Sequence, residues 1–210
     1  MNTEDLNLYL VTNPLEDEKE FLKTIEDAIK GGVTIVQLRE KTGDTGDIYK
    51  IAVKVKEITD KYDIPLIIND RIDIMLAVDC AGIHIGQSDM PCNIARKMVG
   101  PDKIIGVSTS TVEESKKAQM DGADYLGCGA VYPTETKKDA THVTKDTLKE
   151  ISENVDIPVV AIGGIKLDNA ETLANTGIKG LCFVSEIMNA DNPESMSAKL
   201  SEIAEKIIDG

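Results

Sequence analysis

The sequence predicts a single α/β domain over residues 1–210 that folds as a (β/α)8 barrel, the TIM barrel. Three observations lead to this prediction. Eight short apolar segments recur along the chain, segments with helical spacing lie between them, and 210 residues supply one sizeable core. Near-continuous apolar strands that alternate with helices are typical of parallel sheets with right-handed crossovers. Eight such units in one domain favour a closed barrel over an open sheet.

The eight apolar segments are the expected strands, in chain order 8–11, 33–38, 65–69, 82–85, 103–107, 123–129, 158–164 and 180–185. Apolar residues at helical spacing follow the first of them, such as Phe21, Ile25 and Ile29. No Gly-x-Gly-x-x-Gly motif follows the first strand, which argues against a dinucleotide-binding sheet. The longest irregular stretch, from Ala130 to Thr144, follows the sixth strand, and we expect it to be a functional loop.

Composition narrows the classes of partner. The chain carries 23 Lys and Arg against 37 Asp and Glu, a net charge of −14, which repels nucleic acid and anionic membranes. The expected partners are therefore small molecules, and any anionic substrate needs local cations. A homo-oligomer is compatible with a barrel, although no sequence feature locates an interface.

The chain start has no signal-peptide pattern, and no apolar run approaches the roughly 18 residues of a membrane span, so we expect a cytoplasmic protein. The four cysteines, Cys80, Cys92, Cys128 and Cys182, show no Cys-x-x-Cys spacing. We expect them to be small buried hydrophobes rather than metal ligands.

Polar residues gather where the expected strands end, which is the active-site face of a barrel of this type. Gln37, Arg39 and Lys41 close the second strand and share one face because side chains alternate along a strand. We expect that face to line the barrel mouth and to supply cations. A solvated strand edge is the alternative, but the strands of a closed barrel have no such edge.

Two carboxylates follow neighbouring strands. Asp70 comes directly after the third strand, and Asp89 follows the fourth. With phosphate oxygens of a substrate and water, two carboxylates suit the octahedral shell of Mg2+. The alternative is helix capping, by Asp70 of a helix from Ile72 and by Asp89 of a helix from Pro91.

Hydroxyl and amino groups complete the expected phosphate sites. Ser108 closes the fifth strand and reaches the mouth, whereas Thr111 is expected to cap the following helix. The long sixth loop carries Thr134, Thr136 and Lys137, which we expect to bind a phosphate and exclude water. A solvated turn is the alternative for this loop.

The last two strands predict a phosphate cradle, the usual role of these loops in the fold. The seventh strand ends in a Gly-Gly pair that contains Gly164, and the eighth ends at Val184 and Ser185. Glycine is expected there because a Cβ would keep a phosphate from the backbone amides. His84 is expected to pack or hydrogen-bond inside the barrel, while His142 has no evident partner, and no nucleophilic triad is present.

In order, these segments resemble the motifs of the thiamine phosphate synthase family, over about residues 8–187. The matching segments are 37–41, 68–71, 82–89, 106–108, 133–137 and 162–165. The resemblance implies a transferase that joins hydroxymethylpyrimidine diphosphate to hydroxyethylthiazole phosphate and releases pyrophosphate with the help of Mg2+. Ser110, Ala130 and Lys145 depart from the family pattern.

The resemblance also implies a role for each matching residue. The pyrimidine diphosphate would be bound by Gln37, Arg39, Lys41, Asn69, Ser108 and Lys137. Four of these residues would be catalytic, because they would stabilise the leaving pyrophosphate: Arg39, Lys41, Ser108 and Lys137. Asp70 and Asp89 would hold Mg2+, and the thiazole phosphate would contact Thr134, Thr136, Gly164, Val184 and Ser185. Two alternatives remain: a thiazole tautomerase-like barrel, and a non-catalytic sensor of phosphate ligands.

Overall fold

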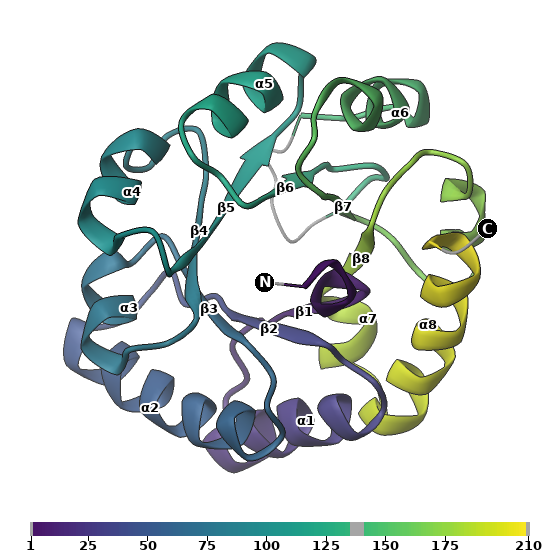
Figure 1. The fold of residues 1–210 in the computed structure, drawn as a ribbon. Helices are drawn as coiled ribbons and strands as arrows, with labels where there is room; N and C mark the ends of the chain where they lie inside the picture. Colours follow the sequence, from purple (N-terminus) through teal and green to yellow (C-terminus); the bar gives the residue numbers. More distant parts are fainter. Residues whose placement is uncertain (1, 135–140, 209–210) are drawn as a thin grey trace.

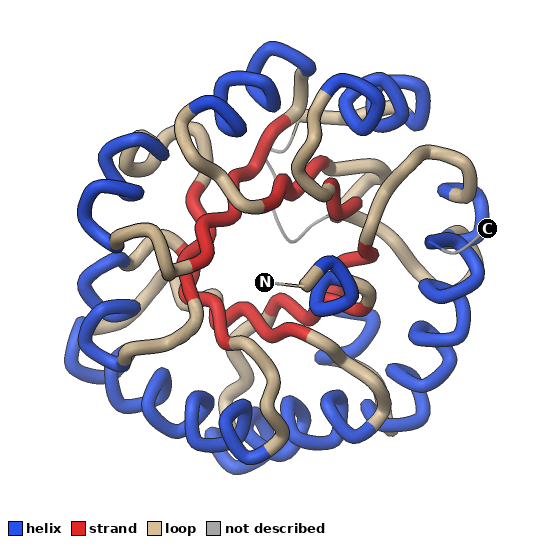
Figure 2. Tube along the Cα trace, viewed as in Figure 1, coloured by secondary structure: helices blue, strands red, loops and turns tan. Residues whose placement is uncertain are grey.

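Eight parallel strands form a closed barrel in this computed structural model, which describes residues 2–134 and 141–208. Each strand pairs with the next, and β8 returns to pair with β1, so the strands form a complete ring with helices outside it (Figures 1 and 2). The strands are β1 (Leu8–Val11), β2 (Ile35–Leu38), β3 (Leu66–Asn69), β4 (Gly82–Ile85), β5 (Ile104–Thr109), β6 (Tyr125–Cys128), β7 (Val159–Ile162) and β8 (Gly180–Phe183). The predicted fold and all eight predicted strands are confirmed.

Helices alternate with the strands around most of the ring. They are η1 (Thr3–Leu6), α1 (Glu18–Lys30), α2 (Thr45–Lys61), α3 (Ile72–Val78), α4 (Cys92–Val99), α5 (Val112–Met120), α6 (Lys145–Asn154), η2 (Ala170–Leu173), α7 (Ser185–Met188) and α8 (Pro193–Ile208). Thr111 caps α5 as predicted, because its side chain accepts a hydrogen bond from the backbone N–H of Glu114. Within the two described stretches, no helix combines the length and the apolar character needed to cross a membrane.

The connection between β7 and β8 differs from the predicted strand and helix alternation. It holds only the short 3-10 helix η2. The Asn169 side chain accepts a hydrogen bond from the Lys166 backbone, and Asn175 and Gly177 adopt positive φ angles of 64° and 77°. Side-chain bonds to the backbone and left-handed residues favour turns over a continuous helix, which explains the difference.

The apolar residues form two separate clusters. The larger lies between the barrel and its helices, and it includes Ile25, Val36 and Ile68. The smaller fills the barrel interior and consists of Leu6, Tyr9, Val11, Ile35, Ile67, Tyr125, Val160 and Cys182. Along each strand, interior residues alternate with outward ones, as the period of a strand requires. All four cysteines are buried and unpaired, as predicted.

The amino-terminal segment covers one end of the barrel. In Figure 1 the 3-10 helix η1 lies within the outline of the ring of strands. Leu6 is completely buried, and the carbonyl of Asn7 accepts a hydrogen bond from the backbone N–H of Leu181. A Cβ at Gly180 would lie 2.0 Å from the Leu6 carbonyl oxygen, so the strand start needs glycine to admit this segment. The polar strand ends therefore gather at the opposite end.

Candidate active site

The polar residues at the strand ends continue the rows of the interior cluster. Gln37 follows the interior residue Ile35 by two positions, and Asn69 follows Ile67 in the same way. Both polar side chains are buried. Because alternate residues share one face, the predicted pyrimidine-binding residues Gln37 and Asn69 face the barrel interior.

A cation and two carboxylates lie together at the ends of β2, β3 and β4. Lys41 Nζ lies 3.3 Å from Asp70 Oδ2. Burial, together with hydrogen bonding and charge repulsion from Asp70, raises the pKa of Asp89, while Lys41 opposes the change. The two carboxylates are therefore neighbours, as predicted, and their repulsion favours an additional positive charge between them.

Neither carboxylate caps a helix, so the structural alternative for both is wrong. Helix α3 has Arg71 as its N-cap and α4 has Pro91, without a side-chain capping bond in either case. Asp89 Oδ2 instead accepts the backbone N–H of Gly86 at 2.7 Å and closes the turn after β4. Asp70 holds a left-handed φ of 60°, a conformation that non-glycine residues adopt mainly at turns and functional sites.

A buried donor without a partner lies beside this pair. Across residues 2–134 and 141–208, two buried side-chain polar atoms make no hydrogen bond, and one is Asn69 Nδ2 at the end of β3. Leaving a buried amide unsatisfied costs about 1–3 kcal/mol, so such an atom needs an explanation. A ligand oxygen or nitrogen above the barrel would supply the missing acceptor.

A continuous chain of hydrogen bonds crosses the barrel interior beneath these groups. Gln37 Nε2 donates to Tyr9 Oη at 2.9 Å, and Tyr9 Oη lies 2.7 Å from Tyr125 Oη. Tyr125 Oη lies 3.0 Å from His84 Nδ1, and His84 Nε2 lies 2.9 Å from Ser108 Oγ. Burial raises the pKa of both tyrosines above the ordinary value, so both hydroxyls keep their protons.

This interior chain confirms one prediction and adds residues that the sequence did not single out. His84 is buried and hydrogen-bonded inside the barrel, as predicted. Tyr9 and Tyr125 had no predicted role because each stands in an apolar strand and resembles a packing residue. Their hydroxyl groups in an inward-facing row were the available signal, because a buried tyrosine hydroxyl needs a hydrogen-bond partner.

The sixth loop is only partly described. Thr134 is half-buried, whereas the predicted phosphate-binding residues Thr136 and Lys137 lie outside the described residues. His142, for which the sequence offered no partner, places Nδ1 3.2 Å from the carbonyl oxygen of Ala130. The structure thus supplies a partner that was not evident in the sequence.

Close packing requires glycine at position 164, independently of the predicted phosphate cradle. A Cβ there would lie 2.5 Å from the Pro133 carbonyl oxygen and 2.8 Å from the Tyr132 Cβ, and its φ is 65°. The glycine therefore lets the end of β7 pack against the start of the sixth loop. This contact brings two of the predicted thiazole-phosphate loop segments together.

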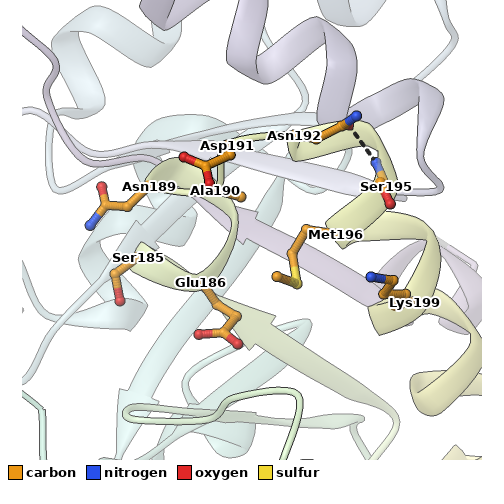
Figure 3. A pocket seen from close by; sticks show the side chains of 9 residues that line it. All are labelled: Ser185, Glu186, Asn189, Ala190, Asp191, Asn192, Ser195, Met196 and Lys199. Atoms are coloured by element: carbon orange, nitrogen blue, oxygen red, sulfur yellow. Dashed lines mark hydrogen bonds between the residues drawn. The ribbon is translucent and has the colours of Figure 1, made fainter.

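The last predicted residues lie on two different surfaces. Val184 packs against the interior cluster. Ser185 is exposed and lines a cavity of about 410 Å³ between α7 and α8, where Figure 3 shows Ser185 and Glu186 across from Met196 and Lys199. Among the described residues predicted to bind substrate, Ser185 alone lines this cavity. This hollow therefore is not the site formed by Lys41, Asp70 and Asn69.

The remaining contacts join the predicted residues into one cluster. Gln87 Nε2 donates to the Ser108 carbonyl at 2.7 Å, which ties the turn before Asp89 to the end of β5. The Arg39 backbone N–H donates to Thr12 Oγ1 at 3.0 Å, so a buried threonine directly after β1 fixes the segment that follows β2. One connected region of the barrel mouth thus contains six of the predicted residues: Gln37, Lys41, Asn69, Asp70, Asp89 and Ser108.

The carboxylates at the barrel mouth suit a Mg2+ ion that takes its remaining ligands from substrate and water. No group of three or more His, Cys, Asp and Glu side chains suited to a metal occurs within the described part of the chain. Mg2+ is normally held by one or two carboxylates together with substrate phosphates and water. The adjacent Asp70 and Asp89 match that requirement, so these residues fit the group that the sequence predicts.

Comparisons with known proteins agree on one family. The profile described as thiamine monophosphate synthase matches residues 8–187. A thiamine-phosphate synthase from Methanobrevibacter smithii is 62% identical over 200 residues, covering 95% of this chain and 96% of the relative. Another from Alkaliphilus oremlandii is 53% identical, with the same coverage of 95% and 96%. The solved structure of a thiamine phosphate pyrophosphorylase from Pyrococcus furiosus superposes with a TM-score of 0.90 at 37% identity and covers 98% of both chains.

Proposed function

The chain belongs to the thiamine monophosphate synthase family, and on that premise we propose how its site performs the synthase reaction. The enzyme is a transferase that joins hydroxymethylpyrimidine diphosphate to hydroxyethylthiazole phosphate and releases pyrophosphate. The observation that carries the proposal is the neighbouring pair Asp70 and Asp89 beside Lys41, next to the unsatisfied donor of Asn69. This arrangement suits a charged diphosphate attached to a hydrogen-bonding ring.

The pyrimidine diphosphate binds across the ends of β2 to β5. Asn69 Nδ2 and the free carbonyl of the Gln37 amide offer one donor and one acceptor to the aminopyrimidine ring. Arg39, Lys41 and Ser108 bind the diphosphate, with Lys137 of the sixth loop as a further cation. Thr134, Thr136, Gly164, Val184 and Ser185 remain the proposed contacts of the thiazole phosphate.

Asp70 and Asp89 would hold Mg2+ together with diphosphate oxygens and water. When bound, the ion supplies positive charge that stabilises the departing pyrophosphate. Burial, and after it the neighbouring Asp70 carboxylate, raise the pKa of Asp89, and a bound cation would stabilise the charged form of both groups. Lys41 supplies part of that charge through its contact with Asp70.

The reaction breaks the C–O bond between the pyrimidine methylene and the diphosphate and forms a C–N bond to the thiazole nitrogen. Positive charge develops on the methylene while negative charge develops on the leaving oxygen. Arg39, Lys41 and Ser108 stabilise that oxygen by charge and hydrogen bonding, which lowers the barrier when the groups are held in place beforehand. The thiazole nitrogen attacks with its own lone pair, so no strong general base is needed.

The test is pyrophosphate release by the purified protein with both substrates and Mg2+, beside controls that omit one component each. Thiamine phosphate and pyrophosphate should form in equal amounts, and only when all three components are present. Binding of both substrates without product would instead support the sensor alternative. Rearrangement of the thiazole phosphate without joining would support the tautomerase alternative.

A further inference from the structure

We propose that Tyr9, Tyr125 and His84 are positioning residues that couple the hydrogen-bonding polarity of Gln37 to that of Ser108. The five side chains form one continuous interior chain of hydrogen bonds between two residues proposed to contact substrate. The proposal rests on the synthase function for the identity of the ligands, but the coupling itself is a property of the free protein.

The direction of the chain follows from counting protons. Gln37 Nε2 donates to Tyr9, so the Tyr9 hydroxyl proton must go to Tyr125. The Tyr125 proton then goes to His84 Nδ1, which leaves the histidine proton on Nε2, facing Ser108 Oγ. With the Gln37 amide nitrogen facing Tyr9, any other assignment leaves a buried hydroxyl proton without an acceptor, at a cost of about 1–3 kcal/mol.

The two ends of the chain consequently have fixed and opposite roles. The Gln37 amide turns its nitrogen toward Tyr9 inside the barrel, so its carbonyl oxygen is the acceptor at the other side of the group. Ser108 Oγ accepts from His84, which leaves its own proton to donate outward. Reversing one end would require reversing every bond between them, because each tyrosine hydroxyl has only one proton.

This polarity matches the proposed substrate. An acceptor at Gln37 suits the amino group of an aminopyrimidine, and a donor at Ser108 suits the oxygens of a diphosphate. The reversed chain would present a donor and an acceptor that suit neither. We therefore expect the interior chain to favour binding of one molecule that carries both groups.

Two glycines leave the space that the rings of Tyr125 and His84 occupy in the barrel interior. A Cβ at Gly106 would lie 2.1 Å from Tyr125 Cζ and 2.5 Å from His84 Nδ1. A Cβ at Gly127 would lie 3.0 Å from His84 Cε1. Two glycines at interior positions of β5 and β6 thus hold the histidine and tyrosine rings at hydrogen-bonding distance, as a positioning role requires.

The first test reads the tautomer of His84 by nitrogen-15 NMR on the full chain without ligand. The chain has two histidines, and a His142→Gln variant assigns the signals. Wild-type His84 should be neutral with its proton on Nε2. Gln37→Glu places an acceptor-only carboxylate against Tyr9 when ionised, which should reverse the chain and move the His84 proton to Nδ1.

The spectra are recorded at about pH 9, far above the usual Glu pKa of about 4.3, and the carboxyl carbon-13 shift at position 37 confirms ionisation. Adding Tyr9→Phe to Gln37→Glu interrupts the chain and should return the proton to Nε2. A tautomer that does not respond to an ionised carboxylate at position 37 would overturn the coupling. A purely structural role of Tyr9 predicts no tautomer change in either variant.

A second test uses binding of magnesium pyrophosphate by calorimetry and does not depend on the charged variant. Tyr125→Phe removes the hydroxyl that donates to His84 Nδ1, so it should weaken binding several-fold when Ser108 is present and should have no further effect in Ser108→Ala. Tyr62→Phe is the matched control, since it removes a tyrosine hydroxyl that contacts Glu26 at the surface between α1 and α2. Additive effects of the Tyr125 and Ser108 substitutions would refute the coupling. A positive tautomer result without product formation would refute the synthase function alone.

Discussion

Replacing Gly106 by alanine tests whether the interior rings are packed without spare room. The added Cβ would lie 2.1 Å from Tyr125 Cζ and 2.3 Å from its hydroxyl oxygen, so the ring must move. Overpacking of this kind costs about 1–3 kcal/mol, and each displaced hydrogen bond adds about 1 kcal/mol. Because the ring bonds both Tyr9 and His84, we expect a total loss of about 3–5 kcal/mol in the free energy of unfolding.

Urea unfolding followed by circular dichroism measures this loss. With a slope of about 2 kcal/mol per molar urea, the midpoint should fall by about 2 M. Gly46→Ala is the matched control, because a Cβ there meets nothing within 4 Å in the first turn of α2. That change should raise stability by about 0.5–1 kcal/mol. A Gly106→Ala midpoint equal to that of the wild type would show that Tyr125 and His84 have room to spare.

Three further substitutions test the site and the charges around it. Asp70→Asn should lower turnover at least about 100-fold and raise the Mg2+ concentration needed for half-maximal rate. A chelator should abolish the turnover of the wild-type enzyme reversibly. Near-normal kinetics of Asp70→Asn would show that Asp70 does not bind the metal. Hydrogen bonding from Lys61 lowers the pKa of Glu26, so Glu26 stabilises the fold above its unfolded pKa and loses this effect as pH falls through the folded value. Glu26→Gln should therefore cost about 0.5 kcal/mol at neutral pH and nothing in acid, which urea midpoints at both pH values would check. Arg96→Met removes donors to the Gly122 carbonyl and to Asp124, and should cost about 3–5 kcal/mol in thermal and urea unfolding with little effect on substrate affinity.

The sequence predicted the barrel because its strands are buried on both faces and so read as apolar runs. Val36 and Ile68 face the helices, while Ile35 and Ile67 fill the interior. It did not predict η2 in place of a helix, since apolar residues such as Ala170 and Leu173 occur at helical spacing there. The turn bonds of Asn169 decide that segment, and they depend on geometry that spacing alone does not define.

The candidate site shows the same division. The inward direction of Gln37 follows from the alternation of side chains along a strand, and the closeness of Asp70 and Asp89 follows from the order of strands, so both were predictable. The hydrogen-bond chain through Tyr9 and Tyr125 was not, because it joins strands that are not neighbours in the ring and depends on ring orientation. Predictions for Thr136, Lys137, Mg2+, oligomeric state and the cytoplasmic location stay predictions.

Closure of the ring has a consequence for the chain during its synthesis. β1 pairs with β8, so the first strand to leave the ribosome waits for the last before it gains its second neighbour. Until Phe183 has emerged, the growing chain presents two unpaired sheet edges, which are the surfaces through which chains aggregate. A nascent chain that stalls before β8 would therefore be inactive and prone to aggregation. A chaperone that covers the β1 edge would protect the growing chain from aggregation through that edge.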